Sequence, residues 1–312
     1  MTDAPLNVLF TWQPESGLEK IERSVPGIRL KATGDRDEML RLAPEADVLC
    51  VGDFDAELLV KSSRLRWVQA LMGGVESVLF REFLSSPVPL TCCKECFAVP
   101  AAEHALALML AFSRRVEYDI RRRPHRSFEY RDPEELLGKT VGIIGTGNMG
   151  QEIALRCRCF GMRVLGLSRQ STQGEGFDEL LSRERLPELL ERADFVVVAV
   201  PLTSETIGLI GKAELNRMKP SAYLIDISGR PAIYDLPSLE SCLKERRIAG
   251  AALQIVPPDE SPLWELDNLL ISFHRTTSPQ EVDRCFELFA DNLGRFQRGE
   301  NLRGLVDKKT GY

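Results

Sequence analysis

A glycine-rich segment constrains the fold of this chain more than any other feature of its sequence. Gly145, Gly147 and Gly150 fit the pattern G-x-G-x-x-G, directly after a strand-like run (140–145) and at the start of a helix-like run (148–160). In that context the first glycine permits a tight turn, the second lets a pyrophosphate approach the backbone, and the third lets the helix pack on the strand. The first helical turn then presents free N–H groups to an anion. The segment predicts a dinucleotide-binding βαβ unit rather than a purely structural glycine turn.

The end of the following strand bears on which dinucleotide is bound. An Asp or Glu about 20 residues after the glycine loop would bind the 2′-hydroxyl of an NAD ribose. Here the strand ends in Ser168 and Arg169, and no carboxylate occupies that place. A hydroxyl and a guanidinium suit a 2′-phosphate, which Arg can bind in a bidentate manner. We therefore expect NADP; the alternative is a solvated Arg169 and an NAD cofactor.

Composition excludes several classes of protein. In 312 residues, 44% are apolar and 28% charged, which is typical of globular domains and rules out a disordered chain. The net charge of −6 provides no field that would attract nucleic acid or an anionic membrane. The longest apolar runs are too short to span a bilayer, and the N-terminal residues do not resemble a signal peptide. We expect a cytoplasmic protein with reduced cysteines and with neither nucleic-acid nor membrane partners.

Short apolar runs alternate with helical patterns along the whole chain, which predicts parallel β/α units. A change of composition near residues 118–138 indicates that one domain is inserted between the ends of another. We expect a first domain of residues 1–102 and 284–312, and a second of residues 103–283 that carries the glycine loop. The expected strands are 7–10, 28–32, 47–51, 67–71, 88–92, 140–145, 163–168, 195–200, 222–228, 250–256 and 269–273. The expected helices are 15–24, 36–42, 55–61, 101–117, 148–160, 186–192 and 279–298.

Most of the chain resembles the D-isomer-specific 2-hydroxyacid dehydrogenase family, through motifs that occur in the family's order. These motifs are 66–76, 100–104, 137–145, 201–206, 224–230 and 271–274. The resemblance implies two Rossmann-like/flavodoxin-like doubly wound parallel-sheet domains, with the active site in the cleft between them. It also implies a homodimer built on the second domain and reversible reduction of a 2-oxo acid by NAD(P)H. The Ser168–Arg169 pair brings the chain closest to the glyoxylate/hydroxypyruvate reductase branch.

The resemblance also assigns roles to individual residues. Arg230 would hold the substrate carboxylate and carbonyl, and His274 would supply the proton. Backbone N–H groups of Gly73, Gly74 and Val75 would also bind the carboxylate. An imidazolium can protonate the oxygen as hydride reaches the carbonyl carbon, and a fixed guanidinium orients the anion. A structural role is the alternative for His274. The implied cofactor-binding residues are Gly145, Gly147, Asn148, Met149, Gly150, Ser168, Arg169, Pro201, Thr206, Ile227, Gln254 and His274.

Three departures from the family pattern bear on catalysis. Ser228 and Gly229 both precede Arg230, where the family has one small residue, and Pro231 follows it. A displacement of Arg230 by about 1 Å would lower the rate roughly a hundredfold. Arg275 follows His274 where small residues are usual. It would either contact a second acidic group of the substrate or point to solvent.

The third departure concerns the carboxylate that pairs with the catalytic histidine. Counting forward from Leu253 places Asp259 at the family's Glu position, whereas counting back from Trp264 implies that the Glu is deleted, with Glu260 nearby. Without a partner, His274 would lose its proton at lower pH, and reduction would fade at lower pH. Gln254 replaces the Asp that usually binds the nicotinamide carboxamide, and its amide can still accept a hydrogen bond.

Cysteine and histidine patterns give no metal site. Cys92, Cys93 and Cys96 lack a second cysteine pair at zinc-ribbon spacing, and adjacent strand residues point to opposite faces. We interpret them as reduced, partly buried thiols, with redox sensitivity as the alternative. His104 is expected to pack on its helix. His125, among four arginines, is expected at a solvated surface or a dimer contact, with phosphate binding as the second interpretation.

The sequence thus predicts an NADPH-dependent reductase of a small 2-oxo acid such as glyoxylate or hydroxypyruvate. The rival is a dinucleotide-binding sensor or interaction protein of the same fold with little turnover, like the C-terminal-binding-protein corepressors. A third hypothesis keeps catalysis but uses NAD and a bulkier acid.

Overall fold

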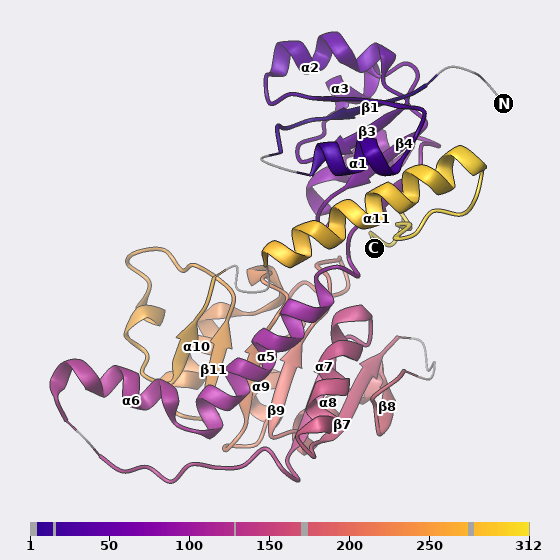
Figure 1. Cartoon of the computed structure of the whole chain (residues 1–312). Helices are drawn as coiled ribbons and strands as arrows, with labels where there is room; N and C mark the ends of the chain where they lie inside the picture. Colours follow the sequence, from indigo (N-terminus) through magenta and orange to yellow (C-terminus); the bar gives the residue numbers. More distant parts are fainter. Residues whose placement is uncertain (1–4, 15–16, 128, 170–173, 274–277, 312) are drawn as a thin grey trace. The chain divides into compact units, whose positions relative to one another are not determined.

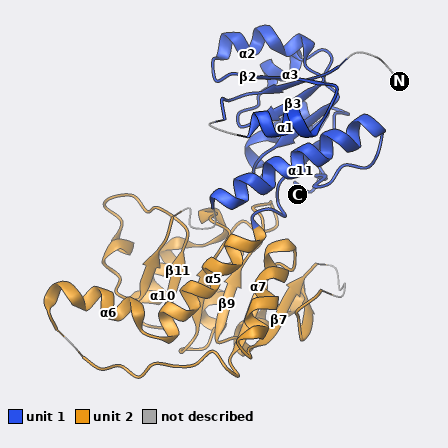
Figure 2. Cartoon of the chain, viewed as in Figure 1, with its two compact units in different colours: residues 1–97, 278–312 blue, residues 98–277 orange. Residues whose placement is uncertain are grey.

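The computed structural model describes residues 5–14, 17–127, 129–169, 174–273 and 278–311, and it divides into two compact units. Unit 1 is residues 1–97 and 278–312, and unit 2 is residues 98–277 (Figure 2). The chain passes from one unit to the other just before α5 (Ala98–Ser113) and just before α11 (Pro279–Arg298). The boundaries expected from sequence lie a few residues inside these helices, because the helical patterns there continue without interruption.

Unit 1 is built on a five-stranded parallel sheet with the order β2-β1-β3-β4-β5 (Figure 1). The order reverses between β1 and β3, and ligands of such sheets bind at the carboxyl ends of the strands at that point. The strands are β1 (Leu6–Phe10), β2 (Ile28–Ala32), β3 (Val48–Val51), β4 (Trp67–Ala70) and β5 (Leu90–Cys92).

Helices cover both faces of this sheet because side chains alternate between the faces of a strand. One face packs Leu49 and Val68 against helices α2, α3 and α4, while the other packs Phe10 and Trp67 against α1 and α11. The helices are α1 (Leu18–Ser24), α2 (Arg36–Leu42), α3 (Ala56–Lys61) and α4 (Arg81–Leu84), with short 3-10 turns at Ala43–Glu45 and Glu76–Val78.

Unit 2 contains a seven-stranded parallel sheet with the order β12-β11-β10-β9-β6-β7-β8. Its order reverses between β6 and β9. Most of these strands are buried along their whole length, as expected for parallel strands covered on both faces. The strands are β6 (Thr140–Ile144), β7 (Arg163–Ser168), β8 (Glu179–Ser182), β9 (Phe195–Val198), β10 (Tyr223–Asp226), β11 (Gly250–Leu253) and β12 (Leu269–Ile271).

Two groups of helices enclose the second sheet (Figure 1). Helices α5 and α7 pack on one face, around Val141 and Ile143. Helices α8, α9 and α10 pack on the other, around Val196 and Leu224. The bounds are α7 (Asn148–Cys159), α8 (Leu186–Arg192), α9 (Lys212–Arg217) and α10 (Leu236–Lys244), with 3-10 turns at Arg183–Arg185, Pro231–Ile233 and Pro262–Glu265.

The helix expected over 101–117 is interrupted. Helix α5 ends at Ser113, and α6 (Val116–Arg122) begins after Arg115, whose φ of 59° is left-handed and ends the helical path. A 3-10 turn at Arg123–His125 follows. Arg121 is one of the four arginines around His125, a cluster expected at a solvated surface or a dimer contact, and it donates to the backbone carbonyls of Leu266 and Leu269. Within the described residues, no helix has both the length and the apolar character required to cross a membrane.

Candidate active site

The glycine loop joins β6 to α7 at the point where the order of the second sheet reverses. Gly145 has a φ of 105°, and a Cβ there would lie 2.7 Å from the Ala199 carbonyl oxygen at the end of β9. A Cβ on Gly150 would lie 2.0 Å from the Gly145 carbonyl oxygen. Both positions therefore require glycine, the first for the turn and the second for the approach of α7 to the loop.

Gly147 differs from its two neighbours in the motif. Its backbone is extended (φ −73°, ψ −165°), and no other atom lies within 4 Å of the place a Cβ would take. Helix α7 begins directly after it, so the N–H groups of Asn148, Met149 and Gly150 belong to the first turn, which has no earlier helical carbonyls to bond. Open space in front of these donors fits the pyrophosphate of a dinucleotide.

The carboxyl ends of β7 and β8 carry a pair of arginines. Ser168 pairs in register with Ser182, so Arg169 and Arg183 follow neighbouring strand ends. Both guanidinium groups contact the same carboxylate oxygen of Glu205, at 3.5 Å for Arg169 and 2.8 Å for Arg183. The place expected to hold a 2′-phosphate therefore contains two cations.

The loop after β9 is closed by a threonine. Thr206 Oγ1 donates to the Pro201 carbonyl at 2.7 Å and accepts from the Thr203 amide at 2.8 Å. Ile227, beyond β10, is buried, and its amide donates to the Val198 carbonyl at 3.0 Å. These contacts hold the ends of β9 and β10 beside the glycine loop.

The inserted residue before Arg230 is accommodated by a buried carboxylate and a left-handed glycine. Gly229 has a φ of 62°, and Ser228 Oγ accepts from the Arg230 amide at 3.2 Å. Asp226, fully buried at the end of β10, holds this turn. Its carboxylate accepts from Ser228 N (2.9 Å), Ser228 Oγ (2.6 Å), Gly229 N (3.3 Å), Tyr234 Oη (2.8 Å) and Gln254 N (3.2 Å). Arg230 itself is half-buried.

Two consequences follow from the burial of Asp226. Burial, followed by the neighbouring Asp226 charge, raises the pKa of Tyr234 well above its ordinary value, so this phenol remains a hydrogen-bond donor. The Gln254 backbone is tied to the same carboxylate, and the Gln254 Oε1 atom lies 3.7 Å from the Cβ position of Gly229. The structure thus brings Gln254 and the arginine turn together at adjacent strand ends. Asp259 lies on an exposed turn between β11 and the 3-10 turn at Pro262–Glu265.

The segment after β12 leads to the expected proton donor. Ser272 Oγ lies 2.9 Å from His104 Nε2 on α5, so His104 contacts this segment besides packing on its own helix. His274 and Arg275 lie outside the described residues.

In unit 1, Gly73, Gly74 and Val75 form the loop after β4. A Cβ on Gly73 would lie 3.3 Å from the Phe97 ring, and Val75 is buried. The preceding residues Leu71 and Met72 line a cavity of about 530 Å³ at the carboxyl ends of the strands. The other lining residues are Trp12, Pro14, Val51, Gly52, Glu281, Val282, Cys285 and Phe286.

Glu281 is the charged group in this lining. It is 4% exposed, and its Oε2 atom has no hydrogen-bond partner within the described residues. Burial raises its pKa from 4.5 to about 7, against a smaller lowering by the Ser278 backbone N–H. The Glu281 amide in turn donates to Ser278 Oγ, so the two residues form a capping box at the start of α11.

Sequence reasoning missed several of these residues. Arg183 follows a strand, β8, that was not expected, and Asp226 was noted only as part of a motif. The cavity residues come from four separate segments and share no local pattern. A serine three positions before Glu281 is the one local signal that could have indicated the cap of α11.

Comparisons with known proteins agree with this arrangement. The model of the "D-isomer specific 2-hydroxyacid dehydrogenase, NAD binding domain" matches residues 106–276. Glyoxylate reductases of Korarchaeum cryptofilum and Pyrococcus furiosus are 32% and 33% identical to the chain, each over 95% of this chain and 94% of the relative. A solved D-isomer specific 2-hydroxyacid dehydrogenase of Xanthobacter autotrophicus, in complex with NADPH and MES, aligns with a TM-score of 0.86 at 25% identity, covering 99% of this chain and all of that chain.

The match to the family model and the identity to relatives of nearly equal length agree with the two doubly wound sheets and the glycine loop described above. The chain belongs to the D-isomer specific 2-hydroxyacid dehydrogenase family, and it is an NAD(P)-dependent 2-hydroxyacid dehydrogenase.

Proposed function

We propose that the enzyme reduces a small 2-oxo acid of the glyoxylate/hydroxypyruvate type to the D-2-hydroxy acid, with NADPH as the hydride donor. The observation that carries the proposal is the pair Arg169 and Arg183 at the carboxyl ends of β7 and β8, next to the dinucleotide loop. Two fixed cations suit a 2′-phosphate, whereas an NAD ribose is bound by a carboxylate. The relatives named glyoxylate reductase and the NADPH-bound Xanthobacter structure support the same assignment.

When bound, the nicotinamide supplies hydride to the carbonyl carbon. The chain holds the pyrophosphate at the first turn of α7 and excludes a side chain at Gly147. Pro201, Thr206 and Ile227 line the ends of the next two strands, and Gln254 accepts from the carboxamide. Each of these positions lies at the carboxyl edge of the unit 2 sheet, where parallel sheets bind such ligands.

The substrate is an anion, and the proposal gives it two sets of donors. Arg230 binds the carboxylate and the carbonyl oxygen, and backbone N–H groups of Gly73, Gly74 and Val75 bind the carboxylate. His274 then donates the proton that the carbonyl oxygen takes up as hydride arrives. Asp259 is the chain's candidate for the carboxylate that keeps this imidazole protonated.

The exposed position of Asp259 gives a pH dependence for the reaction. A carboxylate near solvent interacts weakly with an imidazolium, because water screens the charge. An imidazole beside so weakly interacting a carboxylate loses its proton at lower pH than one beside a buried Glu, so we expect reduction to fall off at lower pH. A pH–rate profile that remains flat well above pH 8 would contradict this part of the proposal.

We also propose a homodimer built on unit 2. Helix α6 exposes Val116 and Ile120, which are 46% and 65% accessible. Apolar side chains of this size in one exposed helix are suited to burial against a second copy. Light scattering of the purified chain measures its mass in solution. The same measurement on an Ile120→Glu variant tests whether this helix contributes to dimer formation.

The function is tested by binding and by turnover. The full chain is titrated with NADPH and with NADH, and then assayed with glyoxylate, hydroxypyruvate and larger 2-oxo acids. We expect tighter binding of NADPH and turnover of the two small acids. His274→Ala and Arg230→Ala abolish turnover, whereas the control variants His125→Ala and Arg217→Ala, at exposed sites elsewhere in unit 2, retain it.

Two other results would replace the proposal. Tight NADPH binding without turnover of any acid would favour the sensor or interaction protein. Preference for NADH together with turnover of a bulkier acid would favour the third hypothesis.

A further inference from the structure

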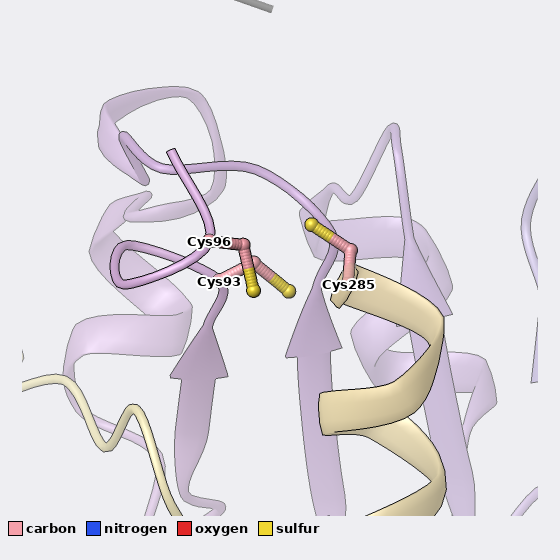
Figure 3. A group of neighbouring side chains, drawn as sticks. All are labelled: Cys93, Cys96 and Cys285. Carbon is pink, nitrogen blue, oxygen red and sulfur yellow. The ribbon is translucent and has the colours of Figure 1, made fainter. Parts of the chain in front are cut away.

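Three cysteine side chains from two distant segments converge in unit 1. Cys93 and Cys96 follow β5, and Cys285 lies in the first half of α11 (Figure 3). Their sulfur atoms all lie within 4.8 Å of one another, and the three side chains are at most 5% exposed. Leu288, also buried, completes the cluster, with Leu71 and Phe97 packed against it.

The backbone fixes the two cysteines of the loop. The Cys96 amide donates to the Cys93 carbonyl at 2.8 Å, which closes the turn between them. The Cys93 amide donates to the Met72 carbonyl at 3.0 Å, so the turn is also attached to the loop after β4. Cys93 and Cys96 thus form a C-x-x-C turn that faces a third sulfur on a helix.

A buried amide points its donor at one of the sulfurs. Gln69 Oε1 accepts from Thr91 Oγ1 at 2.8 Å and from Asn292 Nδ2 at 3.4 Å, which fixes the orientation of the amide. Gln69 Nε2 donates to the Ala70 carbonyl at 2.9 Å and also faces Cys93 Sγ, at 3.6 Å. An N–H donor aimed at sulfur stabilises a thiolate and is typical of the groups that surround metal-bound sulfur.

Positive charge is also present at the cluster. Two arginines approach Cys96: Arg284 on α11, and Arg303, which also pairs with Glu95 at 2.6 Å and with Asp291 at 3.5 Å. Arg284 also donates to the Cys96 carbonyl at 3.0 Å. These guanidinium groups would offset part of the negative charge that thiolate ligands bring to the site.

We propose that Cys93, Cys96 and Cys285 bind one Zn²⁺ ion per chain. Thiolates are the ligands that Zn²⁺ prefers, and three protein ligands leave a fourth position for water. At a Zn–S distance of about 2.3 Å, tetrahedral sulfurs stand about 3.8 Å apart, so small side-chain rotations close the site. Binding releases the thiol protons of the ligands, because zinc binds thiolates, and the ion with three thiolates has a charge of −1 near Arg284 and Arg303.

A cavity meets the cluster from the side of α11. Cys285 and Glu281, one helical turn apart, line the same cavity. The buried Oε2 atom of Glu281, which has no hydrogen-bond partner among the residues that the structure describes, is an acceptor for a zinc-bound water in that space. The site would join the loop after β5 to α11, and thereby the first and last parts of unit 1. It is independent of the proposed reductase function.

The third ligand favours zinc over a redox pair, since a disulfide uses two sulfurs and leaves the third without a role. It also changes the interpretation made from sequence, which had Cys92, Cys93 and Cys96 alone. Cys92 lies on the strand and is not part of the cluster, and Cys285 has no neighbouring cysteine in the sequence to indicate its partners.

The experiment uses the full chain, reduced and freed of metal with EDTA under argon. Zn²⁺ alone is titrated in competition with a chromophoric chelator, and native mass spectrometry counts the bound ions. Cd²⁺ is then added as a spectroscopic substitute, because cadmium–thiolate charge transfer absorbs in the ultraviolet. We expect one ion per chain and a thiolate–metal band.

Cys93→Ser, Cys96→Ser and Cys285→Ser each remove stoichiometric binding and reduce the band. Cys242→Ser, a buried cysteine of unit 2, leaves both unchanged. If the serine variants do not fold, the unaltered chain still decides, since absence of bound Zn²⁺ and of the cadmium band overturns the proposal. The reduced chain is also exposed to air again. If it takes up no ion and forms a disulfide between any two of the three cysteines, the zinc proposal is overturned and a redox pair is indicated. NADPH affinity is measured in parallel, so that failure of the zinc site is distinguished from failure of the reductase proposal.

Discussion

Both parallel sheets of this chain reverse their strand order beside their first strand. Different groups, however, line the edge at which each reversal occurs. In unit 2 the reversal lies between β6 and β9, where backbone approaches backbone: Gly145 stands against Ala199, with no room for a side chain. In unit 1 the reversal lies between β1 and β3, and side chains such as Trp12 and Met72 surround a cavity there. The first edge is thus formed by closely approaching backbone, and the second by mainly apolar side chains around a cavity.

Because of this difference, one edge can be recognised in the sequence and the other cannot. The unit 2 edge is encoded in six consecutive residues, because a close backbone approach needs glycine at fixed spacing. The unit 1 edge needs only apolar residues of suitable size at four separate strand and helix ends. Many sequences satisfy that requirement, so no motif marks it.

The glycine loop gives the sharpest test of this contrast. Gly150→Ala places a methyl group 2.0 Å from the Gly145 carbonyl oxygen, so α7 must move away from the loop. We expect a loss of about 3 kcal/mol in the free energy of unfolding and loss of dinucleotide binding. Thermal unfolding and NADPH titration measure the two effects.

Gly147→Ala is the matched control within the same motif. Its backbone is extended and its surroundings are open, so stability should change by less than about 0.5 kcal/mol. NADPH affinity should nevertheless fall, because the methyl group occupies the space of the pyrophosphate. Equal losses of stability in the two variants would show that Gly150 and Gly147 do not have separate roles in packing and in binding.

The cavity of unit 1 is tested through Glu281. Its pKa of about 7 lies above its ordinary value of 4.5, so the folded state favours the protonated form. The contribution of Glu281 to the free energy of unfolding is therefore fully present below about pH 4.5 and is lost as the pH rises through about 7, by roughly 3 kcal/mol. Arg284 and Cys96 are the neighbouring charged groups and act in opposite directions on this pKa.

Glu281→Gln removes the charge and keeps a side chain that can serve the capping box. In EDTA, we expect the variant to match the parent chain near pH 4.5 and to unfold at higher temperature at pH 8. If the unfolding temperatures of parent and variant change with pH in the same way across this range, the carboxylate is solvated rather than buried.

Arg183 tests the cofactor edge with a smaller effect. Arg183→Gln removes one cation from the expected 2′-phosphate position while leaving Arg169 in place. NADPH affinity should fall about tenfold, with NADH affinity unchanged, since only NADPH carries the phosphate. The control is Arg185→Gln, because Arg185 pairs with Glu188 and Glu179 instead.

Glu205→Gln is expected to have the smallest effect and the opposite sign. Its carboxylate contacts both arginines and competes with a phosphate for them. The variant should bind NADPH a few-fold more tightly, as measured by fluorescence titration. Weaker NADPH binding in this variant would mean that Glu205 positions the arginines rather than competing for them.

Much of the fold was predictable because parallel sheets repeat a simple pattern. Strand 163–168 and helices 36–42, 186–192 and 279–298 have the expected bounds. Strand β8 was missed because its alternation is short and half-exposed, and α5 was overextended because nothing in the sequence marks Arg115 as left-handed.

The residues of the candidate site also fall into a predictable group and an unpredictable group. Residues inside a motif, such as Gly145 and Arg169, were identified with their neighbours. Residues that meet only in three dimensions were not: Arg183 beside Arg169, Asp226 beneath the arginine turn, and Cys285 beside Cys93. Each contact joins segments whose separation in sequence carries no signal of their proximity.

Asp226 has a consequence for the design of altered enzymes. A single carboxylate anchors both the turn that carries Arg230 and the start of the Gln254 segment. We expect that exchanging either loop alone would leave this anchor with the wrong set of donors. Transplanted specificity would have to move 226–234 and 254 together, as one module.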